Sequence, residues 1–400
     1  MFELYFKKGD MKHFADQKKK RADFTAGKIR FLCFIGAVVL LLSACSLHIH
    51  LTPDHTYSSE ERRMLMKRPK LTKKNVRNGK FQQKYETYLS EQFPGRSHLV
   101  TMRTGLSRLL GEKEANGVYF GKDGYLLERY RMQDFEWKQV KKNVKQTASF
   151  AKKYPNAKVM FVPVKSSVLS DKLPMFAQSE GEERFFELIA QHIPKQQQIF
   201  VTDVLKAHNS EYIYYRTDHH WTTLGAYYAY EAWAKSMGLT PIRKEQYQAT
   251  PVTDHFLGTT YAKVRTGGLA DTIFLYERID GPKYTLDYNM GEFQSDRFYD
   301  LTKPESEDPY GVFFGGNQAM VDIRTEEETT NGKTLLIIKD SFGNCFAPFA
   351  AAHYARTIVV DLRYVNLPVS KLLRVYPADD ILILYNSAQF MNDKDISKLK

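Results

Sequence analysis

The sequence predicts an α/β fold in which helices flank a parallel β-sheet. Two stretches carry this prediction, because strand-length apolar runs alternate with helical segments between residues 132 and 203 and again between residues 334 and 385. The composition agrees, since 43% of the 400 residues are hydrophobic and 26% are charged, as in globular proteins with a substantial core. We therefore expect one main domain with appendages.

The N-terminus predicts a cytoplasmic basic tail followed by a membrane segment. Residues 1–30 carry nine lysines and arginines, and residues 31–51 open with an apolar run from Phe31 to Leu42. With the weaker apolar tail behind it, this run approaches the roughly 20 residues that cross a bilayer as a helix. The basic residues come first, so the positive-inside rule keeps them in the cytoplasm. We expect a signal anchor, with a single pass through the cell membrane and an extracellular C-terminal domain.

The same segment permits a second interpretation. Leu42-Ser43-Ala44-Cys45 resembles a bacterial lipobox, in which Cys45 would be lipidated and the preceding peptide removed. A tail of thirty residues is long for a signal peptide, which favours the anchor. Both interpretations leave the rest of the chain outside the membrane, where Cys345 is the only thiol and can form no internal disulfide. We expect Cys345 to be a buried packing residue.

The overall charge predicts acidic partners. The formal net charge is +12 and the sequence pI is about 9.2. No module that interleaves basic and aromatic residues accompanies this excess, so nucleic acid is not the expected partner. A membrane surface or a polyanionic wall polymer suits the charge better.

Residues 52–115 predict a stalk and a helical region. The stalk is polar and charged up to Lys74, and helical periodicity then runs from Asn78 to Leu110. Phe93-Pro94-Gly95-Arg96 interrupts that periodicity and predicts two helices with a turn between them. The main domain, residues 116–400, opens with a hairpin pattern over residues 116–127, where two alternating runs flank a Gly-Lys-Asp-Gly turn.

The first half of the main domain predicts βαβ units. Thr222 and Thr223 can cap its last helix, which Gly238 closes. The expected elements are a helix over residues 132–153, a strand over 158–164, a helix over 182–193, a strand over 198–203 and a helix over 224–237.

Residues of about 240–330 form an expected insertion, irregular and partly β, because Tyr, Gly, Asp and Pro are frequent there and no periodicity is clear. Beyond it, crossover helices are expected over residues 346–354 and 369–375. The three strands between which they lie are expected over residues 334–339, 357–361 and 380–385.

Polar residues follow each of these three strands. Asp340-Ser341 follows the first, Leu362-Arg363-Tyr364 the second and Asn386-Ser387 the third. In open α/β sheets ligands sit beyond the carboxyl ends of the strands. We therefore expect the three strand ends to form one site.

The loop Asp218-His219-His220-Trp221, the histidine loop, lies just ahead of the helix expected over residues 224–237. It can complete that site. A serine hydroxyl needs a base to take its proton and donors to stabilise the oxyanion that follows. We expect Ser341 as nucleophile, His220 as base and Asp218 as the carboxylate that orients it.

Oxyanion or substrate binding would fall to residues around this triad. The candidates are the Asn386 amide, the Arg363-Tyr364 turn, and His219 and Trp221 on the histidine loop.

These motifs carry a family resemblance. The order of strand-Asp-Ser, second strand end and strand-Asn resembles the SGNH hydrolase superfamily, and a histidine loop before the serine resembles its alginate O-acetyltransferase branch. Thr217-Asp218-His219-His220-Trp221 together with Lys339-Asp340-Ser341-Phe342 resembles the bacterial DHHW protein family. Two positions depart from the superfamily, because Lys339 replaces a glycine before Asp-Ser and Arg363-Tyr364 replaces the oxyanion glycine.

The resemblance implies a membrane-anchored, SGNH-like domain that acts on a cell-envelope polysaccharide or wall polymer. It also implies a membrane-bound O-acyltransferase as a possible partner. The function expected is that of a serine acyl-esterase or O-acetyltransferase, with no cofactor. A non-catalytic polysaccharide-binding or assembly factor with the same fold is the alternative. A metalloenzyme using Asp218 and His219 is disfavoured, because adjacent imidazoles lack the spacing of a usual zinc site.

Overall fold

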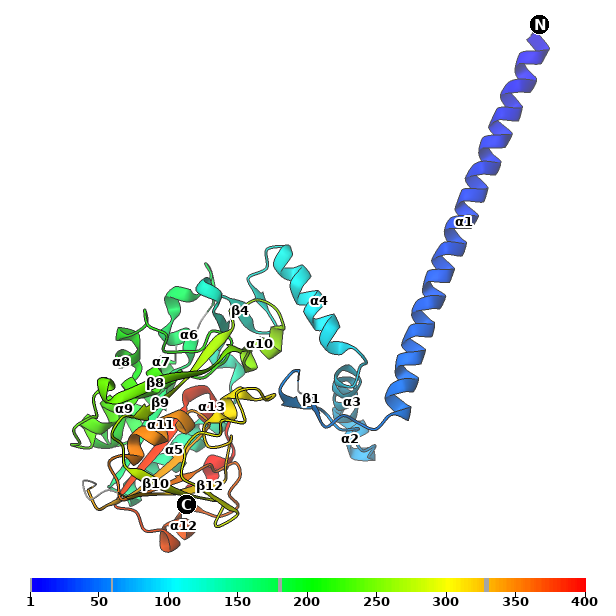
Figure 1. The fold of residues 1–400 in the computed structure, drawn as a ribbon. Helices are drawn as coiled ribbons and strands as arrows, with labels where there is room; N and C mark the ends of the chain where they lie inside the picture. Colours follow the sequence, from blue (N-terminus) through cyan, green and yellow to red (C-terminus); the bar gives the residue numbers. More distant parts are fainter. Residues whose placement is uncertain (1, 59, 179–181, 327–330) are drawn as a thin grey trace. The chain divides into compact units, whose positions relative to one another are not determined.

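The computed structural model describes residues 2–58, 60–178, 182–326 and 331–400, with side chains from residue 26 onward (Figure 1). It divides into two compact units, Met1–Leu99 and Val100–Lys400. Each unit is built from its own elements and is taken by itself below.

The first unit begins with one long helix, α1 (Phe2–Leu51). Its part Ala26–Leu51 is long and apolar enough to cross a membrane, with a mean hydropathy of 2.4 over its most apolar window. At 1.5 Å per residue, 26 residues span about 39 Å, more than the ~30 Å hydrocarbon core. The helix starts well before the expected segment, and no proline interrupts residues 2–51. One N-terminal apolar helix is therefore confirmed.

The remainder of the first unit is small and held by ion pairs. It contains β1 (Tyr57–Ser58), β2 (Arg63–Met64), α2 (Lys73–Arg77) and α3 (Lys80–Glu91). Arg63 bonds Glu91 at 2.6 Å, and Arg96 bonds Glu61 at 2.8 Å. The expected break at residues 93–96 is confirmed, since α3 ends before it and α4 (Arg96–Leu109) begins there.

The second unit is a mixed α/β domain. Its helices are α5 (Trp137–Lys153), α6 (Lys165–Val168), α7 (Glu183–His192), α8 (Thr202–Ala207), α9 (Thr223–Ser236), α10 (Thr259–Val264), α11 (Gly343–Ala351), α12 (Val369–Val375) and α13 (Ser387–Asn392). Its strands are β3 (Glu114–Ala115), β4 (Val118–Phe120), β5 (Leu126–Glu128), β6 (Ala157–Val162), β7 (Gln198–Phe200), β8 (Tyr247–Phe256), β9 (Asp271–Arg278), β10 (Lys283–Tyr288), β11 (Phe293–Ser295), β12 (Met320–Glu326), β13 (Thr334–Lys339), β14 (Arg356–Val360) and β15 (Asp380–Asn386).

The main sheet has eight strands in the order β11-β10-β12-β14-β13-β15-β6-β7. The five from β14 to β7 are parallel, as expected, and the register pairs Ile338 with Val360 and Lys339 with Leu384. The other three pair antiparallel and come from the region expected to be an irregular insertion. That region is thus more ordered than its composition suggests, because its strands extend an edge that the parallel strands provide.

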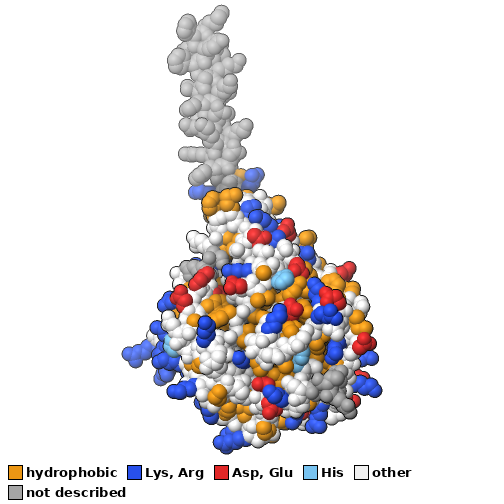
Figure 2. Space-filling view, turned by 90° about the vertical axis from the view of Figure 1, so that its left-hand side faces the viewer, with side chains coloured by type: hydrophobic (Ala, Val, Ile, Leu, Met, Phe, Trp, Pro, Cys, Tyr) orange, Lys and Arg blue, Asp and Glu red, His pale blue; other side chains and the backbone are white. Residues whose placement is uncertain are grey.

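Helices cover both faces of this sheet, and alternate residues of β13 face opposite sides. Leu335 and Ile337 pack in one core with residues of α9 and α11, and Leu336 and Ile338 pack in the other with residues of α5 and α7. Over the face shown in Figure 2, basic, acidic and hydrophobic side chains are interspersed. The carboxyl ends of β13, β14 and β15 meet at one edge, which brings Ser341 and Asn386 to the same end of the sheet.

Candidate active site

The turn after β13 carries Ser341 and is called the serine turn. It is held by the carboxylate of Asp340. Its two oxygens accept the backbone N–H of Phe342 at 2.9 Å and that of Asn386 at 2.8 Å, so one side chain joins the serine turn to the end of β15. Burial raises the pKa of Asp340 to about 6, although Arg363 and the two amides favour its ionised form. Ser341 is thereby fixed just past the end of the strand.

The histidine loop is fixed from beneath by a buried carboxylate, Asp271. Its oxygens accept the backbone N–H of Arg216 at 2.6 Å and of Thr217 at 2.7 Å, together with the Tyr212 hydroxyl at 2.5 Å. Thr222 caps α9 with its side chain, as expected, by accepting from the Gly225 N–H. The loop is therefore held at both ends.

A buried lysine holds the centre of the same loop. Lys165 Nζ donates to the carbonyls of Tyr215, Arg216 and Asp218 at 2.9, 3.2 and 2.7 Å. Burial lowers the pKa of Lys165 to about 8, although Asp271 and Asp218 favour its charged form. An ammonium group has three N–H donors, so each carbonyl receives one.

The structure brings Ser341, His220 and Asp218 into one chain of hydrogen bonds. His220 Nε2 lies 2.7 Å from Ser341 Oγ, and His220 Nδ1 lies 2.5 Å from Asp218 Oδ1. The second Asp218 oxygen accepts from the Thr259 N–H at 2.7 Å and from the Thr259 hydroxyl at 2.9 Å. This geometry can pass a proton from the serine to the imidazole and hold that imidazole in one tautomer.

The charge state of the site follows from its neighbours. Burial opposes ionisation of Asp218, but the two histidines and the bonds from His220 and Thr259 more than offset it, so the pKa of Asp218 lies well below its usual range. Burial and the like charge of His220 lower the pKa of His219 to about 4. One third of the His219 side chain is exposed, yet its ring lies 3.9 Å from that of His220. At neutral pH the carboxylate is ionised and His219 is neutral.

Aromatic residues pack the base and the serine turn together. Tyr310, on a short 3-10 turn (Pro309–Val312), stacks on His220 with 4.0 Å between ring centroids, and its hydroxyl donates to the Ser341 carbonyl at 3.2 Å. Trp221 is fully buried and donates its Nε1–H to the Phe342 carbonyl at 3.1 Å. Trp221 thus holds the serine turn through this hydrogen bond. Its buried indole has no exposed face that a substrate could contact.

Two candidate oxyanion donors each have an N–H without a partner among the described residues. The Ser341 N–H has no hydrogen-bond partner among the described residues. Asn386 Nδ2 donates to the Val162 carbonyl at 3.1 Å, and within the described part of the chain its second hydrogen has no partner. The Asn386 carbonyl oxygen is used to cap α13.

Arg363 and Tyr364 are arranged differently. Arg363 forms two bonds with Asp361, Nε to Oδ1 at 2.9 Å and Nη2 to Oδ2 at 2.6 Å, and buried Lys339 reaches the same carboxylate at 3.2 Å. Tyr364 is 53% exposed. The guanidinium of Arg363 is therefore bonded to Asp361, and its positive charge favours the ionised form of Asp340 without a direct contact.

One group of described residues could hold a metal ion, since ligand atoms of Asp218, His219 and His220 lie within 4.8 Å of one another. Both ring nitrogens of His220 already have partners, Asp218 and Ser341. Asp218 in turn accepts from Thr259 and His220. The donor set fits a proton relay better than a metal, because a bound ion would displace these hydrogen bonds.

Several supporting residues carry no signal that the sequence alone reveals. Gly258 lies so close to the loop that a Cβ there would come 2.2 Å from the Asp218 Cβ. Thr259, Lys165 and Asp271 act through contacts with residues 41 to 55 positions away, and no local pattern marks such contacts. Tyr310 likewise reaches Ser341 across 31 positions.

Residues 184–360 match the family described as DHHW protein. No curated protein matches the chain significantly. Among solved structures, a DHHW family protein from Eubacterium siraeum is 24% identical with a TM-score of 0.57, over 71% of this chain and 95% of that one. Bacillus cereus PatB1, solved with a sulfonyl adduct, is 20% identical with a TM-score of 0.59, over 71% of this chain and 98% of that one.

The O-acetyltransferase domain of Pseudomonas putida AlgJ is a more distant likeness. It is 11% identical with a TM-score of 0.41, over 70% of this chain and 94% of that one. The likeness to the first two structures confirms the α/β fold with helices on both faces of a large sheet. Residues 184–360 of this chain, which include the histidine loop and Ser341, are therefore similar to the DHHW protein family.

Proposed function

We propose that the chain is a serine acyl-esterase or O-acetyltransferase of the cell envelope that acts on a polysaccharide or wall polymer. The observation that carries the proposal is the continuous hydrogen-bond chain from Ser341 Oγ through His220 to Asp218. An ordinary structural serine has no need of an imidazole whose other nitrogen is held by a buried carboxylate. The same three residue types in the same roles serve acyl transfer on unrelated folds.

In the proposed reaction, His220 Nε2 takes the Ser341 proton as Oγ attacks an ester carbonyl. The negative oxygen that develops is met by the Ser341 N–H and by Asn386 Nδ2, each typically worth about 3 kcal/mol of barrier. His220 then gives the proton to the departing alcohol, which leaves an acyl group on Ser341. Water or a polymer hydroxyl, activated by His220 in turn, takes that acyl group; water gives hydrolysis and a hydroxyl gives transfer.

Two observations support the location that we propose. The helix Ala26–Leu51 is long enough to anchor the chain, and basic residues precede it. The positive-inside rule then puts the α/β unit outside the cell, and lipidation of Cys45 would put it on the same side. Acyl-coenzyme A is a cytoplasmic donor, so a transferase outside needs its acyl group delivered across the bilayer. A membrane-bound O-acyltransferase is the partner that suits this need.

The test is reaction with a sulfonyl fluoride, which is suggested by the sulfonyl adduct named for PatB1. We expect the detergent-solubilised chain to gain one sulfonyl group on Ser341 by mass spectrometry and to lose hydrolysis of a small aryl acetate. Ser341→Ala should show neither labelling nor turnover, and Ser236→Ala, at an exposed serine, should behave as the wild type. An unlabelled but folded wild-type chain would favour the alternative, a non-catalytic polysaccharide-binding or assembly factor.

A further inference from the structure

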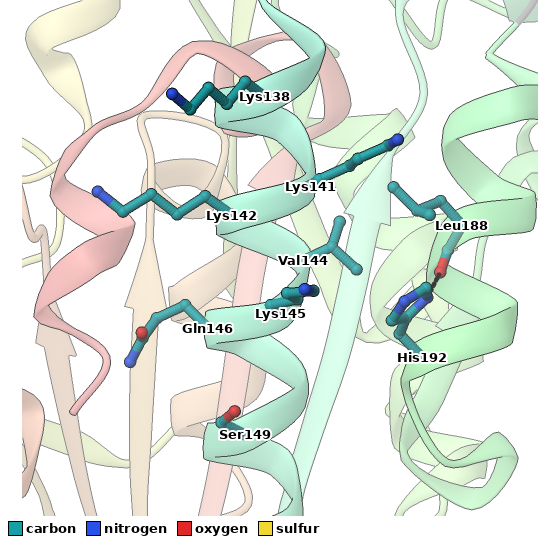
Figure 3. A pocket seen from close by; sticks show the side chains of 9 residues that line it. All are labelled: Lys138, Lys141, Lys142, Val144, Lys145, Gln146, Ser149, Leu188 and His192. Carbon is teal, nitrogen blue, oxygen red and sulfur yellow. Dashed lines mark hydrogen bonds between the residues drawn. The ribbon is translucent and has the colours of Figure 1, made fainter.

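A basic groove lies on the α5 side of the sheet, away from the histidine loop. It has a volume of about 660 Å³ and runs along the exposed face of α5 towards α7 (Figure 3). Val144 and Leu188 contribute apolar atoms to its lining, and His192 stands at its α7 wall. The groove is defined here by four lysines of α5 and is called the α5 lysine groove: Lys138, Lys141, Lys142 and Lys145.

The charges of this groove are not paired with carboxylates of the described residues. Each of the four lysines has another three or four residues away, so they lie on one face of α5 and repel one another. All four are exposed, and none forms an ion pair with a carboxylate in the described ranges. α5 contains six lysines and no acidic residue. Other basic residues of the domain, such as Arg356 on Asp322, do have acidic partners.

The groove leads to the edge of the sheet that carries Ser341. α5 precedes β6 directly and returns along it, so its first turn lies near the carboxyl end of the parallel strands. Lys138 is in that first turn, and Lys145 follows seven residues later, about 10 Å down the helix. α5 packs on one face of the sheet, and α9, which follows the histidine loop, packs on the other. The groove is thus separate from the catalytic candidates, and its Lys138 end lies towards the end of the sheet that carries them.

The side chains indicate the kind of ligand. Lysines act as flexible point charges, which suits an anionic chain better than one rigid carboxylate that an arginine fork would grip. The nearby indole of Trp137 is covered by the Arg184 guanidinium at 3.9 Å, so this ring is not free to stack on nucleic-acid bases. Among the described residues, α5 and α7 expose no large hydrophobic side chain that could enter a membrane.

We propose that the α5 lysine groove binds a linear polyanion whose repeating units carry phosphate or carboxylate groups. Binding in the groove would hold one stretch of the polymer while a neighbouring stretch reaches Ser341. The binding itself does not depend on acyl chemistry; only its benefit to turnover rests on the proposed function. The basic groove therefore narrows the substrate class from any envelope polymer to an anionic one.

The binding test uses the full-length chain in a non-ionic detergent, with fluorescently labelled polyphosphate and polygalacturonate as probes. We expect at least one probe to bind, and Lys138→Gln, Lys141→Gln, Lys142→Gln and Lys145→Gln combined to weaken that binding tenfold or more. Because four cations no longer meet the polymer, the slope of log affinity against log salt should fall by about three. Ser341→Ala should bind as the wild type does, which separates failure of the groove from failure of the serine chemistry.

A matched variant controls for net charge. Lys206→Gln, Lys235→Gln, Lys283→Gln and Lys371→Gln remove the same four charges at exposed positions outside the groove, and binding should change less than threefold. Equal losses in both variants, or no binding of either polymer, would overturn the proposal. Tighter, groove-dependent binding to phosphatidylglycerol vesicles than to both polymers would overturn it too, in favour of a membrane surface.

A second readout connects the groove to turnover. The groove variant should hydrolyse a small aryl acetate at the wild-type rate, because none of its four lysines contacts the serine turn. On an acetylated polygalacturonate or an acetylated polyphosphate-linked glycan, its KM should rise about tenfold with kcat unchanged. A fall in small-ester hydrolysis together with polymer hydrolysis would instead mean that α5 supports the fold.

Discussion

His219 and His220 are neighbours in the chain but have different partners. His220 bonds Asp218 and Ser341 through its two ring nitrogens. His219 Nδ1 bonds the Thr259 hydroxyl at 2.6 Å, and that hydroxyl also donates to Asp218. The second histidine can therefore act as a base, whereas the first belongs to the network that fixes the carboxylate.

This difference predicts unequal effects on acyl-ester turnover. His220→Ala removes the base and should lower kcat by about 10²–10⁴-fold. His219→Ala leaves the relay from Ser341 to Asp218 intact, so kcat should fall by no more than about tenfold while the Tm falls. Steady-state kinetics and thermal unfolding of the two variants measure both quantities. A larger kcat loss for His219→Ala would move the base to that residue.

Lys165 predicts an alkaline limit to activity. As the pH passes about 8, its ammonium loses one of the three N–H groups that hold the histidine loop. We expect kcat/KM to decline above pH 8 in the wild type. Lys165→Met, which lacks all three bonds, should be at least tenfold slower at pH 7 and should lose that part of the pH profile.

Deprotonation of Lys165 should also change the stability of the fold. The free energy of unfolding should rise with pH over the range in which activity falls. The pKa of Lys165 is about 8 in the folded chain against an ordinary value of 10.5, so the unfolded chain binds this proton more tightly. Between pH 8 and 10.5 the contribution of Lys165 to the free energy of unfolding therefore rises while activity falls. Urea unfolding of wild type and Lys165→Met across this range gives the difference. An alkaline limb that survives in Lys165→Met would assign it to another group.

At the scale of elements, the entry into α10 decides where Asp218 lies. Gly258 precedes that helix and leaves no room for a side chain, because a Cβ would come 2.2 Å from the Asp218 Cβ and 2.4 Å from its Oδ2. Gly258→Ala should push α10 and the loop apart, stretch the bonds between Thr259 and Asp218, and lower kcat by ten- to a hundredfold. Kinetics with the small ester test this expectation.

A second glycine provides the control for that substitution. Gly105 lies within α4, and outside its own helix backbone no described atom lies within 4 Å of the position that its Cβ would take. Gly105→Ala should leave kcat unchanged and should stabilise the helix slightly, by up to about 1 kcal/mol. A Gly258→Ala variant with unchanged kcat would show that the loop tolerates the displacement.

The elements that the sequence predicts best are those with the strongest local pattern. The apolar runs over residues 334–339 and 380–385 correspond closely to β13 and β15, because buried parallel strands are hydrophobic on both sides. The strand expected over residues 198–203 ends at Phe200, where α8 follows. β10 and β12 have no comparable local pattern, since their pairing with each other and with β14 is a tertiary contact.

The residues of the candidate site also fall into those that the sequence can identify and those that it cannot. Ser341, His220 and Asp218 can be named from the sequence because each belongs to a short motif beside a recognisable strand or helix. Tyr310 and Thr259 cannot, since each lies in a region of weak periodicity and reaches the site only through the folded chain. The role of Asn386 depends on the orientation of one amide, and the sequence carries no information about that orientation.

At the scale of the whole molecule, the apolar helix predicts the topology. We expect the intact chain to sediment with membranes and its α/β unit to be cleaved by protease added outside intact protoplasts, because the basic residues before Ala26–Leu51 stay inside. A tag after Lys400 allows the cleavage to be followed by immunoblot. Replacing Cys45 with Ala separates the anchor from the lipoprotein, since only a lipoprotein is cleaved before Cys45 and would become longer when that cysteine is lost. Protection of the tag would refute the topology.

The position of β15 has a consequence for how this protein reaches its folded state. β15 lies between β13 and β6, so β6 is synthesised long before the strand that it pairs with. Val162 of β6 pairs with Asn386, which lies 224 residues later in the chain. Contacts so distant in sequence form slowly, and two strand edges stay open to other chains meanwhile. We expect the sheet to close only after synthesis of the last residues, and a chain ending at Val375 to aggregate and to be digested rapidly by protease. A nascent chain of this kind is a natural client for a folding chaperone.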